Sequence, residues 1–412
     1  MHVAIIGAGW AGLAAAVELL EQGQAVSLFE AGRVAGGRAR SVQWQGHTLD
    51  NGQHILLGAY RDTLSLMRKL GADPAHCFTR LPLRITDPSG FSLRLPLLPA
   101  PLNLAWGLMT ARGISLTEKL KAALWMQSIK WRGFRLPAHR AEQTVAQWLD
   151  AAGQTGKLRQ HLWEPLCLAA LNTPVHKASA QLFANVLRDS LGSPRRADTD
   201  LLLPTRPFGE LLPEPGLGWL AKRGAALHMG HRVTHCQAHP DHVTVDEQRF
   251  DAMILAVAPH HLNRLWPAAS PPTHHEPIAT VYLQYPGAPR LPFPLFNLND
   301  RIGQWLVDRG QGLLACVISG QGEWEKLDDQ QLASALIHAI APLPGFTDIT
   351  PHWQKVIREK RATFSAEPGL QRCEPHPHPR VSIAGDHTWA EYPATLEGAV
   401  RSGQRAARQL LA

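Results

Sequence analysis

A glycine-rich loop near the amino terminus has the residue types and spacing to bind a dinucleotide. The segment Gly7-Ala8-Gly9-Trp10-Ala11-Gly12 fits G-x-G-x-x-G and stands between a short apolar run and a stretch with helical apolar spacing. Gly7 allows a tight turn, Gly9 lets the backbone approach a pyrophosphate, and Gly12 lets helix and strand pack closely. The first turn of the helix then offers N–H groups and a positive dipole end to the anion. The alternative is a purely structural glycine turn.

A carboxylate and a second glycine pair follow, and they argue against that alternative. Glu30 ends the next apolar run, 18 residues after Gly12, where it can accept hydrogen bonds from both ribose hydroxyls and disfavours a 2′-phosphate. Gly36 and Gly37 allow a second close approach of backbone to the dinucleotide, and Arg38 can neutralise a phosphate. Together these features favour a flavin dinucleotide.

The elements that must position these residues alternate between strand and helix. Strand-like runs at 3–6 and 25–29 flank a helical pattern at 11–22, and this βαβ start favours a parallel sheet. Further strands are expected at 242–245, 253–257, 281–285, 313–319 and 381–384, and further helices at 116–131, 332–340 and 395–411, with two more inside 144–170. The prolines predict that 94–109 is irregular and that 204–215 is a loop.

Composition narrows the class of protein. The 412 residues are 45% apolar and 18% charged, which excludes a disordered or collagen-like chain. No apolar stretch reaches the roughly 18 residues that a membrane-spanning helix needs. The five cysteines are scattered and none forms Cys-x-x-Cys, which excludes zinc ribbons and Cys-ligated clusters and suits a reducing compartment. We expect no metal site, no signal peptide and a cytoplasmic protein.

A second motif lies near the carboxyl end. It begins at Gly385-Asp386-His387-Thr388-Trp389 and continues through Tyr392-Pro393-Ala394-Thr395-Leu396-Glu397-Gly398-Ala399. With the amino-terminal glycines, it resembles the flavin-dependent amine oxidase and carotenoid desaturase superfamily. In that superfamily the Gly-Asp pair contacts the ribityl chain and the pyrophosphate, and the following helix aims its N-terminus at the flavin ring. Arg232-Val233 resembles the part whose valine touches adenine.

This resemblance implies noncovalent FAD as the cofactor, since no cysteine lies in the carboxyl-terminal block. The residues expected to bind it are Gly7, Gly9, Ala11, Gly12, Glu30, Ala31, Gly36, Gly37, Arg38, Gly52, Gln53, His54, Val233, Gly385, Asp386, Thr395, Leu396 and Ala399. The implied fold class is α/β, with a discontinuous Rossmann-type FAD-binding domain and an inserted α+β substrate domain. We expect the FAD-binding domain to take residues 1–90, 215–270 and 375–412, and the substrate domain to take 91–214 and 271–374.

Three stretches resemble one family within the superfamily. Residues 49–60, 162–174 and 384–403 are similar to the hydroxysqualene dehydroxylases of bacterial hopanoid pathways. The resemblance implies a long-chain isoprenoid alcohol as substrate: hydroxysqualene loses its hydroxyl as water, reduced FAD delivers hydride from N5, and squalene forms. It also implies upstream prenyl synthases as partners.

Other functions remain open on the sequence alone. A carotenoid-type desaturase of a prenyl hydrocarbon would share the fold, the flavin and the access to lipid. A non-catalytic flavoprotein that scaffolds isoprenoid synthases would share the cofactor. An amine oxidase would need a polar access route and an amine clamp, which the sequence does not reveal.

The candidates for catalysis are His54 and Glu164. A leaving hydroxyl needs a proton donor, and His54 follows a glycine-containing turn expected near the flavin ring, although it could equally serve to fix its loop. Glu164 stands among apolar residues, where burial would suit it to act as an acid; the alternative is a helix-end carboxylate paired with an arginine. Trp389 and Tyr392 could wall the site or pack in the core, and Asp50 is expected to shape its turn.

Residues 95–140 combine apolar bulk with positive charge. The chain carries a net charge of +7, and residues 111–140 hold seven basic residues against one acid, directly after an apolar segment. This combination predicts contact with an anionic membrane surface. Nucleic acid is excluded as a partner for two reasons. DNA binding would not explain the apolar segment that precedes the basic residues, and no nucleic-acid-binding motif is present. The expected location is peripheral, on the inner face of the cell membrane; the alternative is a core-packing segment with a solvated basic helix.

Overall fold

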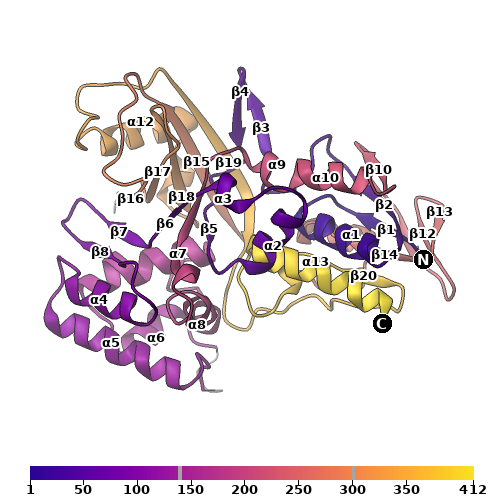
Figure 1. Cartoon of the computed structure of the whole chain (residues 1–412), viewed down its shortest axis with the longest axis horizontal. Helices are drawn as coiled ribbons and strands as arrows, with labels where there is room; N and C mark the ends of the chain where they lie inside the picture. The colour runs from indigo at the N-terminus through magenta and orange to yellow at the C-terminus, as the bar shows by residue number, and fades with distance from the viewer. Residues whose placement is uncertain (138–141, 299–301) are drawn as a thin grey trace.

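A parallel five-stranded sheet supports one half of the molecule. In the computed structural model, which describes residues 1–137, 142–298 and 302–412, its strands run in the order β10-β2-β1-β14-β20. They are β1 (His2–Ile6), β2 (Ala25–Glu30), β10 (Ala226–Met229), β14 (Ala252–Leu255) and β20 (Val381–Ile383), and all neighbours are parallel. Three distant parts of the chain therefore share one Rossmann-type sheet (Figure 1).

Two helices pack closely over this sheet. They are α1 (Trp10–Glu21) and α13 (Leu396–Leu411), which lie side by side in Figure 1. The close approach depends on glycine, because a Cβ on Gly403 would lie 2.0 Å from the Ala11 carbonyl oxygen. Further elements around the sheet are α2 (Arg61–Lys69), α3 (Pro74–Cys77), α9 (Phe208–Leu211), α10 (Pro213–Ala221), α11 (Pro259–Leu265) and the antiparallel strands β11 (Cys236–Ala238), β12 (Val243–Val245) and β13 (Gln248–Phe250).

An antiparallel sheet forms the core of the second half. Its strands, in the order β16-β17-β18-β15-β19, are β16 (Leu295–Asn297), β17 (Trp305–Asp308), β18 (Leu313–Ser319), β15 (His275–Gln284) and β19 (Trp353–Phe364). Side chains alternate between its two faces: Val281 and Leu283 pack with α12 (Asp329–Ile340), whereas Tyr282 faces the opposite side. The sheet thus separates α12 from the helical part described next.

A helical layer covers that opposite side (Figure 1). It contains α4 (Leu102–Thr110), α5 (Leu116–Trp131), α6 (Val145–Ala151), a π-helix (Arg159–Trp163), α7 (Glu164–Leu171) and α8 (Ala180–Asp189). Short antiparallel pairings connect the parts: β3 (Ser41–Trp44) with β4 (His47–Asp50), β7 (Arg84–Thr86) with β8 (Ser92–Arg94), and β9 (Leu201–Pro204) with both β5 (Leu56–Leu57) and β6 (Phe78–Leu81). The predicted fold class, a discontinuous Rossmann-type domain with an inserted α+β part, is confirmed.

Two predictions about local structure are wrong. The segment 94–109 was expected to be irregular, yet α4 begins directly after Pro101, since proline disturbs only residues before or within its own turn. The segment 204–215 was expected to be a loop, yet α10 begins at Pro213, a first-turn position that tolerates proline. The predicted domain boundaries, of which the one at residue 90 falls within the β7–β8 hairpin, stay predictions.

Candidate active site

A cavity of about 1210 Å³ joins the two halves of the molecule. On one side it is lined by the loops that follow the parallel strands and by the start of α13. Of the residues predicted to bind the cofactor, all but Gly12 line this cavity. Gly12 instead lets helix and strand pack closely, which is the role that the sequence predicted for it. A Cβ at this position would lie 1.9 Å from the Gly7 carbonyl oxygen, so only glycine allows the helix to begin this close to the strand.

The two glycine segments form a narrow cradle at the start of α1. Gly7 has φ +110°, and a Cβ on it would lie 2.5 Å from the Ala256 carbonyl oxygen. The Gly36 amide donates to the Ala8 carbonyl at 2.8 Å, which brings Gly36 and Gly37 beside Gly9. No side chain caps α1, and its first turn holds no acid. Its N–H groups are therefore free to bind an anion, as the pyrophosphate of FAD requires.

The Glu30 carboxylate lies at the carboxyl end of β2, at the rim of this cradle. Its two oxygens accept hydrogen bonds from the backbone amides of Ala8 and Gly32, each at 2.8 Å. These bonds hold the carboxylate in place and leave further lone pairs for ribose hydroxyls. Val233 also lines the cavity, where the resemblance places adenine. The geometry thus fits the adenosine end of a dinucleotide.

Arg38 and Asp386 form an ion pair on the cavity wall. Arg38 Nη2 donates to both carboxylate oxygens, at 2.8 and 2.7 Å, and Nη1 donates to the Ala362 carbonyl oxygen. Burial alone would raise the pKa of Asp386, but the Arg38 guanidinium and a hydrogen bond from His387 hold it well below its usual range. Arg38 is thus paired with a protein carboxylate, and its role in neutralising a phosphate stays a prediction.

His54 lies on the cavity wall with a defined ring orientation. Its Nδ1 is 2.8 Å from the Gly52 carbonyl oxygen, so in the neutral ring Nδ1 carries the hydrogen and Nε2 is an acceptor. Burial lowers the pKa of His54, although the Gly52 contact opposes this effect, and the neutral form is favoured at pH 7. His54 can therefore donate a proton only after it has been protonated. Its role as proton donor stays a prediction.

Asp50 is buried behind this loop and shapes it, as predicted. One carboxylate oxygen accepts from the Phe208 amide at 2.7 Å, and the other lies 3.5 Å from Arg309 Nη1. Arg309 also donates to the Gln53 side chain at 3.0 Å, and Tyr282 Oη donates to the Asp50 carbonyl oxygen. This network fixes the turn that presents Gln53 to the cavity.

The prediction that Glu164 is a buried acid is wrong. Its side chain is 37% exposed, and Oε1 accepts a hydrogen bond from Arg159 Nε at 2.8 Å. The cavity is lined instead by its neighbours on α7, Leu166, Ala169 and Ala170. Glu164 begins α7 and turns to the surface, because the apolar side chains of that helix occupy the inner face. It is the helix-end carboxylate paired with an arginine that the sequence offered as the alternative.

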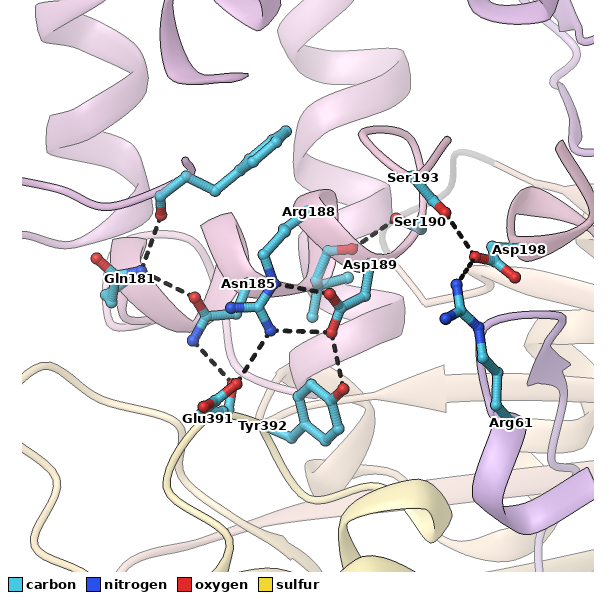
Figure 2. Close-up of polar contacts among 12 residues, drawn as sticks. Arg61, Gln181, Asn185, Arg188, Asp189, Ser190, Ser193, Asp198, Glu391 and Tyr392 are labelled. Atoms are coloured by element: carbon cyan, nitrogen blue, oxygen red, sulfur yellow. Dashed lines mark hydrogen bonds and ion pairs between the residues drawn. The ribbon is translucent and has the colours of Figure 1, made fainter. Parts of the chain in front are cut away.

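The part of the cavity beyond His54 is largely apolar. Its walls come from the inserted part and from the β5 region: Ile55, Leu57, Leu83, Ile85, Leu166, Ala169, Ala170, Val186, Leu191, Leu201, Leu295, Trp305 and Val317. The sequence analysis did not identify Asp189, an acid that also lines the cavity and accepts a hydrogen bond from Tyr392 (Figure 2). Asp189 follows an ordinary amphipathic helix pattern, so no signal in the sequence marks it.

Comparison with known proteins agrees with this geometry. A family model described as flavin containing amine oxidoreductase matches residues 10–411. The chain belongs to this family. As a member, it is an FAD-dependent oxidoreductase, and the cradle, Glu30 and the start of α13 are the parts that would hold the cofactor.

Curated relatives match this member of the family over nearly their whole length. Hydroxysqualene dehydroxylase from Rhodopseudomonas palustris is 29% identical, with 100% of this chain and 98% of that protein covered. The enzyme of the same name from Sinorhizobium fredii is 28% identical, with 98% and 97% covered. Probable zeta-carotene desaturase from Synechococcus elongatus is 23% identical, with 100% and 98% covered. Among solved structures, cyclohexylamine oxidase from Brevibacterium oxydans has a TM-score of 0.72 at 20% identity, covering 99% of this chain and 98% of that one, which supports the fold.

Proposed function

We propose that this flavoprotein removes the hydroxyl group of hydroxysqualene reductively and releases squalene. The observation that carries the proposal is the near-complete coverage of this chain by relatives named hydroxysqualene dehydroxylase. The cavity supports it, because the same cavity that holds the glycine cradle expected to bind FAD also has largely apolar walls suited to an isoprenoid chain. Reduced FAD, when bound, supplies the hydride that replaces the hydroxyl.

The chain's own residues would bind, orient and shield the substrate. The apolar walls from α7, α8 and β17 hold the hydrocarbon and exclude water, so positive charge that develops at the reacting carbon is not captured by solvent. Trp305 and Tyr392 add aromatic rings to these walls. The hydroxyl must leave as water, and His54 is the proton donor that we propose for it.

Anaerobic turnover tests this proposal. Purified holoenzyme, reduced with dithionite and supplied with hydroxysqualene, should form squalene, which mass spectrometry detects. Oxidised holoenzyme with the same alcohol is the control and should leave it unchanged. If the reduced enzyme leaves hydroxysqualene unchanged, the proposed reaction is wrong.

A desaturase is the second candidate, because relatives named zeta-carotene desaturase also cover the full chain. A desaturase would remove hydrogen from a prenyl hydrocarbon and would need an oxidant rather than a reductant. Oxidised holoenzyme that introduces double bonds into a saturated prenyl chain, without acting on hydroxysqualene, would favour this reading.

We also propose that α4 and α5 bind an anionic membrane surface. Large apolar side chains are exposed along both helices and the segment before them: Leu97, Leu98, Leu102, Trp106, Met109, Leu116, Leu120, Leu124 and Trp131. On α5, Leu116, Leu120 and Leu124 follow one helical face, opposite the buried Trp125 and Ile129. Trp131, at 80% exposure, ends the helix. An apolar face of this size calls for a partner.

The charges beside this face favour lipid as the partner. Exposed basic side chains surround it: Arg112, Lys121, Lys130, Arg132 and Arg135. Lys119 is half-buried and donates a hydrogen bond to the Met109 carbonyl oxygen, and Arg140 lies outside the described residues. No helix within the described ranges is long and apolar enough to cross a bilayer. The two helices lie at one edge of the molecule, far from α1 in Figure 1, so peripheral contact leaves the FAD-binding half free. A cytoplasmic location and prenyl synthase partners stay predictions.

Flotation with liposomes tests this surface. Wild-type protein should float with anionic vesicles at low salt, and Leu120→Glu/Leu124→Glu should stay in the soluble fraction. Lys121→Glu/Lys130→Glu should weaken flotation on anionic vesicles, whereas Lys222→Glu/Lys326→Glu, the same change of charge elsewhere on the surface, should not. Wild-type protein that stays soluble with anionic vesicles at low salt would contradict the proposal.

A further inference from the structure

Asp189 and Tyr392 form a hydrogen-bonded pair on the wall of the apolar part of the cavity. Asp189 ends α8 in the inserted part, and Tyr392 lies four residues before α13 in the FAD-binding part. Tyr392 Oη donates to Asp189 Oδ2 at 2.7 Å (Figure 2), and both residues line the cavity. The pair therefore brings polar atoms from both halves to one point.

Neighbouring side chains hold this pair from behind. Arg188 Nε donates to Asp189 Oδ1 at 2.7 Å, and its Nη2 donates to Glu391 at 3.1 Å. Asn185 Nδ2 donates to the Glu391 carbonyl oxygen at 2.9 Å (Figure 2). The segment that carries Tyr392 is thus fastened to α8 at Asn185 and Arg188 as well as at Asp189, so the position of the tyrosine ring is fixed before a ligand binds.

The hydrogen positions in the pair follow from its charges. Burial alone would raise the pKa of Asp189, but hydrogen bonds from Arg188 and Tyr392 lower it, so the carboxylate is ionised. Burial and the bond to Asp189 both raise the pKa of Tyr392, so the phenol stays protonated. The phenol hydrogen is therefore donated to Asp189, and the lone pairs of Tyr392 Oη remain available to accept a hydrogen bond.

The surroundings of the pair make such an acceptor selective. Val186, Leu191, Leu201 and Ala170 line the same cavity and offer no side-chain hydrogen bonds. The hydroxyls of Ser190 and Thr199, which also line it, donate their hydrogens to the backbone carbonyl oxygens of Val186 and Arg196. A hydrocarbon leaves a buried acceptor unpaired, whereas an alcohol satisfies it. Thr395 and Leu396, which line the cavity at the start of α13, occupy the part that the resemblance places beside the flavin ring.

We propose that Tyr392 is the group that recognises the substrate's hydroxyl, with its Oη accepting the hydrogen bond that the hydroxyl donates. Asp189 is a positioning residue that orients the phenol. This inference rests on the proposed dehydroxylase function and deepens it, because it names the contact that distinguishes an alcohol from a prenyl hydrocarbon.

Binding to oxidised holoenzyme, which does not turn the alcohol over, tests the contact. The affinities for hydroxysqualene and for squalene are measured from the change in flavin absorbance. Wild-type enzyme should prefer the alcohol, and Tyr392→Phe should weaken binding of the alcohol about 3- to 10-fold, the range for one neutral hydrogen bond, with binding of squalene unchanged. Tyr60→Phe removes a second tyrosine hydroxyl from the cavity wall and should leave the preference intact.

A double-mutant cycle tests the role of Asp189. Asp189→Ala should also lower the preference for the alcohol, and Asp189→Ala combined with Tyr392→Phe should lower it no further than Tyr392→Phe alone. Additive losses, or a Tyr392→Phe enzyme that loses affinity for both ligands equally or for neither, would overturn the proposal. So would a wild-type enzyme without preference for the alcohol. Failure of the proposed function is seen separately, as absence of squalene formation by the reduced wild-type enzyme.

Discussion

At the scale of single residues, the cavity wall combines groups whose partners are near in the sequence with groups whose partners are far away. The glycines and Glu30 act within one βαβ unit, so their spacing alone located them. Arg38 instead bonds a residue 348 positions later, and Asp189 one 203 positions later. Spacing carries no information about such pairs. The sequence therefore indicated Asp386 only through the family resemblance, and it missed Asp189.

The ion pair between half-buried Arg38 and buried Asp386 should stabilise the fold without cofactor. Asp386→Asn should lower the free energy of unfolding of FAD-free protein at pH 7 by about 1.5–3 kcal/mol, the range for a hydrogen bond to a charged group. The folded-state pKa of Asp386 lies below the unfolded value of about 3.9, so its contribution is present above that pH and is lost as pH falls through the folded-state pKa. In urea unfolding, the difference from wild type should therefore shrink below about pH 4.

An ion pair with an exposed carboxylate provides the control for this prediction. Asp329, whose side chain is 64% exposed, accepts a hydrogen bond from Arg358, so Asp329→Asn should change the free energy of unfolding by no more than about 0.5 kcal/mol. Equal effects of the two substitutions at pH 7 would contradict the role assigned to Asp386.

The pH dependence of turnover reports on His54. Because burial lowers its pKa, the protonated ring exists only on the acid side of the ordinary value of about 6.5. The single-turnover rate of reduced enzyme with hydroxysqualene should therefore rise as pH falls from about 8 to about 5, and His54→Asn should remove this dependence. If the wild-type rate does not depend on pH and His54→Asn is equally active, His54 is not the proton donor and only fixes its loop.

At the scale of elements, local patterns predicted most helices and strands, and tertiary packing decided the exceptions. The pattern of α5 predicted its bounds well, but it could not show that one apolar face stays exposed while the opposite face is buried. The prolines before α4 and at the start of α10 obscured helices that they in fact permit. Strand β15 pairs with β18 and β19 across long intervening segments, so neither the strand order nor the register could be derived from spacing.

The contact between α1 and α13 should depend on one glycine. A methyl group on Gly403 would meet the Ala11 carbonyl, so Gly403→Ala should lower the free energy of unfolding by about 1–3 kcal/mol and weaken FAD binding, because both helices begin at the cavity. Gly218→Ala on α10 is the matched control. No atom lies within 4 Å of the added methyl there, and better helix propensity should make it neutral or stabilising by about 1 kcal/mol. Urea unfolding and FAD fluorescence titration measure both effects, and equal losses in the two variants would contradict the packing argument.

At the scale of the whole molecule, the site exists only because distant segments meet. The cradle comes from the amino terminus, Val233 from the middle, and the start of α13 from the carboxyl end, while the apolar walls come from the inserted part. The motifs predicted the first three together, since all three are expected to bind the same dinucleotide. The inserted walls carry no motif, because an apolar cavity needs only size and shape, and many sequences supply those.

This assembly predicts that FAD stabilises the entire fold and that its adenosine half is needed for the effect. Adding FAD to FAD-free protein should raise the thermal midpoint, with a gain of about 2.7 kcal/mol at one hundred times the dissociation constant. FMN lacks the adenosine that Glu30 and Val233 are expected to hold, so it should stabilise less at the same concentration. If FMN stabilises as well as FAD, the assignment of Glu30 and Val233 is wrong. If neither raises the midpoint, the cavity is not the cofactor site, and the placement of the substrate beside it fails as well.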